Sequence, residues 1–348
     1  MKSISDLLQR LSCAPRSQDF EEVASEKKPG LVDMPLNVMH QICENLEYKN
    51  VMALRKTSRC LRDFIISQNC YQNVDCLDVQ VRYTKVLRLS ETYIYYYPKN
   101  NGCRQWIREA EKEHGSEVFI GKVDPDELFY GDLKIALTSQ TSVMKNFTIG
   151  RSDSTSLLRD IEQWLKGRRT LLKVNHLVFF PIDVEQTLSI LPYLDPRHLT
   201  SLEDLEDRGT VEIDQIVDLE QWKGLKKVKF FKKVAQKDLR HLLAIPTARF
   251  RMAKLEQEDL MFIKETCISL PTFIQYDIHL DTSIPRHAFE FLGNAYIDRS
   301  EARCRKWYFY MPKIHDDVVQ VSLTFTKYSV TFKRMKWASV PEGARVQE

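Results

Sequence analysis

Glycine is scarce in this chain: there are eleven glycines among 348 residues. The sequence contains no G-x-x-x-x-G-K-[ST] and no G-x-G-x-x-G, the loops that let a backbone approach a phosphate closely. It also lacks the G-x-S-x-G turn of α/β-hydrolases and the H-E-x-x-H helix of zinc proteases. Because no catalytic motif is present, we expect a protein that is not an enzyme and needs no cofactor.

Long apolar runs are also missing. No stretch approaches the ~20 apolar residues that cross a bilayer, and no signal peptide is apparent at the N-terminus. The eight cysteines form no C-x-x-C pair, which indicates reduced thiols rather than a disulfide framework or a metal site. The net charge of +3 does not by itself indicate nucleic acid or membrane as a partner, and binding to either would need a local charged patch. We therefore expect an intracellular protein, in the cytoplasm, the nucleus or both.

Hydropathy patterning divides the chain into four parts. Residues 1–29 are polar and charged, which predicts a flexible leader. Residues 30–72 carry helical periodicity in three short segments. Residues 73–140 change to the two-residue period of short strands, with connecting helices. Residues 141–335 alternate strand-like runs with amphipathic helical segments, which predicts a βα repeat.

The first helix of the 30–72 segment has a clear apolar face. Its members are Val38, Met39, Ile42, Cys43 and Leu46. Asp33 stands where a cap would precede Pro35, and Asn50 is expected to cap the second helix. Three short helices bury little surface by themselves. Such a unit either packs on the rest of the chain or presents apolar residues to a partner.

The strand-like runs of the C-terminal part recur at a near-regular interval. They cover residues 147–149, 177–180, 199–205, 225–231, 249–252 and 273–280. From residue 177 onward they start about 22 to 26 residues apart, within the repeat range of leucine-rich and related βα solenoids. The leucine-rich consensus is not kept. The expected fold class is therefore α/β, with three N-terminal helices followed by an irregular, leucine-rich-repeat-like βα domain.

The helical segment resembles the F-box family. The resemblance rests on Leu31-x-x-Met34-Pro35, a helix ending at Leu46, a second short helix, and then Thr57-Ser58-Arg59 before a third. Met34, Asn37 and Thr57 depart from the usual Leu, Glu and Val of that pattern. In this family the helices pack against a Skp-family adaptor, which joins them to a cullin. The resemblance implies adaptor-contacting or supporting roles for seven residues: Leu31, Met34, Pro35, Ile42, Leu46, Val51 and Leu54.

A second resemblance covers roughly residues 140–300. The segments 202–205 and 216–227, the second with Glu220-Gln221-Trp222-Lys223 at its centre, are similar to the FTH domain of nematode F-box proteins of the F-box A type. The two resemblances together imply a substrate-receptor subunit of an SCF-type cullin ubiquitin ligase, with a target protein held by the C-terminal domain for ubiquitin-dependent degradation. One alternative is an adaptor-bound interaction protein without a role in degradation.

A dense basic run suggests where a target could bind. Its candidate residues are Lys226, Lys227, Lys229, Lys232 and Lys233. Either this run and the acidic stretch before it form two solvated faces that neutralise each other in part, or the run recognises an acidic or phosphorylated segment. A nucleic-acid-binding module that uses residues 223–233 is a further alternative, although we expect neither nucleic acid nor membrane as a partner.

Overall fold

The computed structural model describes twelve segments of the chain. They are residues 31–46, 48–68, 74–81, 84–99, 102–152, 155–179, 184–205, 207–282, 286–297, 303–314, 316–324 and 328–347. The leader expected over residues 1–29 lies outside the described residues. Within the described part, no helix combines the length and the apolar character needed to span a membrane.

The N-terminal unit consists of short helices, as the periodicity predicted. They are the 3₁₀ turn η1 (Leu31–Asp33), α2 (Leu36–Glu44), α3 (Tyr48–Thr57) and α4 (Arg59–Ser67). Two details of the expected helix starts are wrong. Pro35 is itself the residue before α2, while Asp33 lies in η1, and α3 begins at Tyr48, so Asn50 lies inside that helix. Each helix begins within four residues of the end of the preceding one, so the short turns fix where α2 and α3 begin. The Ser58 hydroxyl does cap α4, by accepting a hydrogen bond from the Leu61 amide at 3.1 Å.

An antiparallel sheet region follows the helices. Its strands are β1 (Cys76–Val81), β2 (Lys85–Leu89), β3 (Thr92–Lys99), β4 (Gly102–Glu109) and β5 (Ser116–Phe119). The 15-residue helix α5 (Pro125–Ser139) comes next, and the Asp124 carboxylate caps it by accepting a hydrogen bond from the Asp126 amide at 2.7 Å. Pro125 occupies the first helical position, where a missing N–H costs nothing.

Parallel βα units form the middle of the molecule. The strands are β6 (Met144–Ser152), β7 (Val174–Phe179), β8 (Ser201–Asp204), β10 (Lys227–Val234), β11 (Thr247–Met252) and β12 (Gln275–Leu280). The connecting helices include α6 (Thr155–Lys166), α7 (Val184–Ile190), α8 (Asp214–Val217), α9 (Glu220–Lys223), α10 (Leu239–Leu243) and α11 (Gln257–Ser269). The strands pair in parallel, β6 with β7, β7 with β8, β8 with β10, and so on to β12. The expected βα alternation is therefore present.

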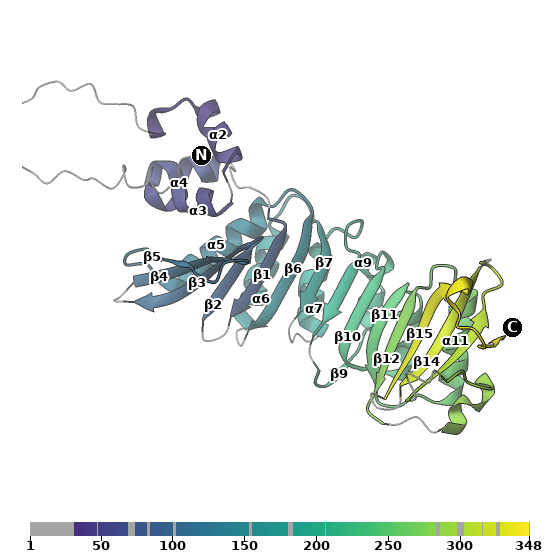
Figure 1. The fold of residues 1–348 in the computed structure, drawn as a ribbon. Coiled ribbons are helices and arrows are strands. Elements are labelled where there is room, and N and C mark those ends of the chain that lie inside the picture. Colours follow the sequence, from purple (N-terminus) through teal and green to yellow (C-terminus); the bar gives the residue numbers. More distant parts are fainter. Residues whose placement is uncertain are drawn as a thin grey trace, which may run out of the picture.

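Closing strands complete the far end. They are β13 (Cys304–Tyr310), β14 (Asp317–Thr324), β15 (Ser329–Lys336) and β16 (Val346–Gln347). β15 pairs antiparallel with β12, and β1 pairs in parallel with β6, so all the strands belong to one mixed sheet. The strands stand in one row, with the N-terminal helices at one end and the closing strands at the other (Figure 1).

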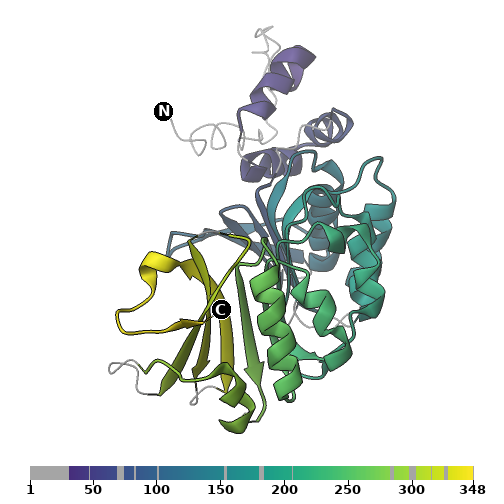
Figure 2. The ribbon, with the colours of Figure 1, turned by 90° about the vertical axis from the view of Figure 1, so that its right-hand side faces the viewer.

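The connecting helices lie on one side of the sheet (Figure 2). Strand residues that face them are buried, for example Val228 and Phe230 of β10 and Phe250 of β11. Their neighbours Lys229 and Arg249 point to the other side, as the two-residue period of a strand requires. In the middle of the sheet, the face away from the helices therefore carries polar side chains.

Asp195, in the turn before β8, gives a prediction on pH dependence. Its carboxylate accepts hydrogen bonds from Arg197, from Nη2 at 2.7 Å and Nε at 3.0 Å, and these lower its pKa from 3.8 to about 2. A carboxyl group with a lowered pKa stabilises the fold above its unfolded pKa, and this contribution is lost as the pH falls through the folded pKa. The stability difference between wild type and Asp195→Asn should therefore shrink between about pH 5 and pH 2. Urea denaturation at several pH values measures it; a constant difference would contradict the assignment.

Candidate functional site

The N-terminal helices have a small core of their own. Cys43, Val51 and Ile65 are buried together, one from each helix. Leu46 and Leu54, both predicted as adaptor-contacting or supporting residues, are partly buried and pack against this core. Val51 has no exposed surface, so in this conformation it can support a binding surface but cannot touch a partner.

An apolar edge is exposed where the first helix begins. Met34 is 40% exposed and Leu36 is 66% exposed, and Pro35 between them is also exposed. Of the other predicted residues, Leu31 and Ile42 are half-buried. Leu36 was not among the predicted residues. The sequence signal for Leu36 was its position in the first turn of an amphipathic helix. We call Met34, Pro35 and Leu36 the apolar edge.

A buried carboxylate joins the helical unit to the rest of the molecule. Asp132 of α5 has a fully buried side chain, and Arg55 Nη1 and Lys56 Nζ of α3 lie 2.9 and 3.2 Å from its two oxygens. The Tyr96 hydroxyl of β3 donates to it at 2.8 Å, and Gln105 of β4 accepts from Lys56 at 3.0 Å. Four elements therefore meet at one carboxyl group.

Apolar packing supports the same junction. Met52 of α3 is 2% exposed and belongs to the large core of the sheet rather than to the small core of the helical unit. An ion pair removed from water holds its geometry because breaking it leaves a buried charge uncompensated. The orientation of the helical unit relative to the sheet is thus set by Met52 and the Asp132 contacts.

Part of the basic run lies on the face of the sheet away from the helices. Lys229 of β10 stands opposite Glu203 of β8, and the Nζ atoms of Lys227 and Lys229 lie 2.9 and 3.2 Å from the Glu203 carboxylate. His176 of β7 approaches the same carboxylate at 3.3 Å. The hydrogen bond to His176, and to a lesser extent the two lysines, hold the pKa of Glu203 well below its usual range. These two lysines are therefore paired with an acidic neighbour.

The remaining lysines of the run do not share the Glu203 carboxylate. The register of β10 against β11 shifts between Lys229 and Lys233, which breaks the alternation of faces. Lys232 approaches Asp204 at 3.4 Å, and Lys233 approaches Asp281 at 2.6 Å. Lys226, just before the strand, is exposed. Four of the five lysines are thus paired with three different carboxylates, Glu203, Asp204 and Asp281.

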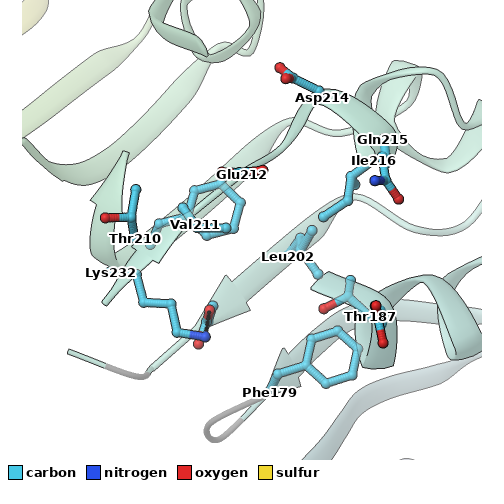
Figure 3. A pocket seen from close by; sticks show the side chains of 13 residues that line it. Phe179, Thr187, Leu202, Thr210, Val211, Glu212, Asp214, Gln215, Ile216 and Lys232 are labelled. Carbon is cyan, nitrogen blue, oxygen red and sulfur yellow. Dashed lines mark ion pairs between the residues drawn. The ribbon is translucent and has the colours of Figure 1, made fainter. Parts of the chain in front are cut away.

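A cavity of about 520 Å³ lies at the carboxyl ends of β7, β8 and β10 (Figure 3). Its apolar lining comes from buried side chains: Phe179, Leu202, Val211, Ile216 and Phe230. The polar lining consists of uncharged side chains and four carboxylates. Lys232 is the one basic lining residue among the described residues, and it is paired with Asp204. Asp214 at its edge forms an ion pair with Lys237. Two of the four acidic residues on the lining, Asp204 and Asp214, are therefore paired with lysines.

Metal ligation receives no support within the described ranges, where no group of three or more His, Cys, Asp or Glu side chains could hold an ion. The six cysteines in those ranges are free thiols. Burial alone raises the pKa of Cys267, so it lacks the character of a reactive thiolate.

Comparison with known proteins finds two domain families that match different parts of the chain. The F-box domain family matches residues 31–73, and the FTH domain family matches residues 155–294. At 23% identity over 278 residues, the chain is similar to F-box A protein 224 of Caenorhabditis elegans, with 76% of this chain and 71% of that protein covered. No solved structure gives a significant match. The chain therefore carries an F-box domain over residues 31–73 and an FTH domain over residues 155–294.

Proposed function

We propose that this protein is a substrate-receptor subunit of an SCF-type cullin ubiquitin ligase. The F-box domain implies binding to a Skp-family adaptor and, through it, to a cullin. The single observation that carries the proposal is the apolar edge, in which Met34 and Leu36 are 40% and 66% exposed on a domain of this family. Exposed apolar groups of this kind, rimmed by polar residues, mark protein interaction sites.

In this proposal the sheet domain holds the target. F-box and FTH proteins are typically non-catalytic, and such a receptor acts by tethering. Tethering raises the local concentration of the target near the loaded conjugating enzyme, which turns a bimolecular encounter into an effectively intramolecular one. The contacts at Asp132 suit this role, because a fixed angle between the two domains fixes where the target stands.

The basic run does not favour the alternative of nucleic-acid binding. Four of its five lysines lie within ion-pair distance of a carboxylate: Lys227, Lys229, Lys232 and Lys233. Binding to phosphates would have to compete with these internal partners. We propose instead that the lysines support the target-binding side of the sheet.

Recovery of a cullin tests the receptor role. The purified chain should capture a cullin from a mixture of purified components only when a Skp-family adaptor is also present. In cells, deletion of residues 31–68 should abolish this capture and slow the turnover of any protein that co-purifies with the sheet domain. Capture of the cullin without any change in turnover would favour an adaptor-bound protein that does not promote degradation.

A further inference from the structure

A hollow of about 270 Å³ lies on the face of the sheet away from the helices, over β10, β11 and β12. Its lining brings together basic and aromatic side chains from three strands: Lys229 and Phe231 of β10, Arg249 and Arg251 of β11, and His279 of β12. The exposed Asp207, before β9 (Thr210–Val211), also lines it. The lining residues span positions 207 to 280 of the sequence, so no linear motif indicates the hollow.

Most cations around this hollow are already paired. Lys229 contacts Glu203, and Arg251 Nε and Lys233 Nζ share the two oxygens of Asp281 at 2.5 and 2.6 Å. Arg249 is the fourth cation at this hollow, and among the described residues it has no carboxylate partner. Its guanidinium donates one hydrogen bond, from Nε to His279 Nε2 at 3.2 Å.

The exposed Arg249 guanidinium has hydrogen-bond donors available for a ligand. The bond from Nε to His279 leaves its Nη1 and Nη2 hydrogens, which form the planar fork that matches a carboxylate with two parallel hydrogen bonds. The Phe231 ring lies beside it, with its centroid 5.9 Å from Arg249 and 4.8 Å from Lys229 Nζ. An aromatic face next to a cation excludes water from one side, which strengthens a charge-assisted hydrogen bond made there.

The charges around Arg249 favour a carboxylate over a phosphate as the ligand. One unpaired guanidinium matches one negative charge, whereas a phosphate monoester carries about −1.5 to −2. A phosphate would also face Asp207 on the lining of the hollow and Glu203 beside Lys229. We propose that Arg249, supported by Phe231 and His279, binds the carboxylate of an aspartate or glutamate in an extended acidic segment of the target. This inference rests on the proposed function, because it assigns a chemical class to the target.

A labelled hexaglutamate peptide is the probe for this site, with hexaglutamine and a phosphoserine peptide of equal length as comparisons. Fluorescence anisotropy at low salt should detect hexaglutamate and not hexaglutamine. Arg249→Gln should weaken binding about tenfold or more, because a hydrogen-bonded charge pair is lost. Arg249→Lys should recover only part of it, because an ammonium group lacks the fork. Arg159→Gln, which removes an exposed arginine from α6 on the helical side, should leave the affinity unchanged.

Three results would overturn the inference. Equal losses in Arg249→Gln and Arg159→Gln would mean non-specific attraction, tighter binding of the phosphoserine peptide through Arg249 would mean a phosphate site, and no binding of hexaglutamate would mean no site. Adaptor affinity, measured on the same proteins, separates this inference from the proposed function. A chain that binds the adaptor but not hexaglutamate retains the proposed function and loses the inference, whereas a chain that binds no adaptor loses the proposed function itself.

Discussion

Replacing Asp132 with alanine should lower the free energy of unfolding by about 3–5 kcal/mol, because it leaves two largely buried cations without their partner. The Arg55 and Lys56 side chains are only 15% and 16% exposed, so water cannot replace the lost carboxylate fully. The Tyr96 hydroxyl, also buried, would lose its acceptor in the same variant. Urea denaturation followed by circular dichroism measures the change.

Two further variants make this result specific. Lys134→Ala removes an exposed charge from the same helix and should change stability by no more than about 0.5 kcal/mol. Replacing the three charged groups and the Tyr96 hydroxyl with apolar groups, as Arg55→Met, Lys56→Met, Tyr96→Phe and Asp132→Leu together, should restore much of the loss, because no buried charge is left unpaired. A loss in Asp132→Ala no larger than that in Lys134→Ala would show that the cluster does not hold the F-box domain to the sheet.

Disrupting the apolar edge should have the largest effect on adaptor binding. Met34→Ser together with Leu36→Ser removes two apolar side chains, each worth ~1.5–3 kcal/mol when fully buried by a partner. We expect the affinity for a Skp-family adaptor to fall by about 100-fold or more. Because both residues are exposed in the free chain, thermal stability should change little.

Ile274→Ser is the matched control for the apolar edge. Ile274 is 55% exposed, between the Met34 and Leu36 values, and it lies just before β12, far along the sheet from the F-box domain (Figure 1). This variant should bind the adaptor as wild type does. Undiminished affinity in the Met34 and Leu36 double variant would assign the adaptor contact to another part of the domain.

Much of the fold follows from periodicity in the sequence. The apolar face with Met39 and Cys43 predicts α2, and the near-regular spacing of strand-like runs predicts the parallel βα units, because burial on one face repeats with the geometry of each element. The pairing of β1 with β6 could not be predicted in this way. A pairing between distant segments leaves no local pattern, so the single continuous sheet emerges only in three dimensions.

The candidate sites also differ in whether the sequence could predict them. The resemblance placed Met34 and Pro35 at the start of the F-box, where the structure has them exposed. The junction at Asp132 was not foreseen, because its partners Arg55 and Lys56 lie more than 70 residues away in the sequence. The role of Arg249 could not be predicted for a similar reason: Arg249 joins the basic run only by the register of β11 beside β10.

Titration of the purified chain with a purified Skp-family adaptor tests the central claim most directly, because it needs neither a target nor a cullin. The account predicts a single binding event by calorimetry, with one adaptor per chain and a dissociation constant of about 1 μM or tighter. An absence of binding heat at several temperatures, together with separate elution of the two proteins in gel filtration, would contradict it.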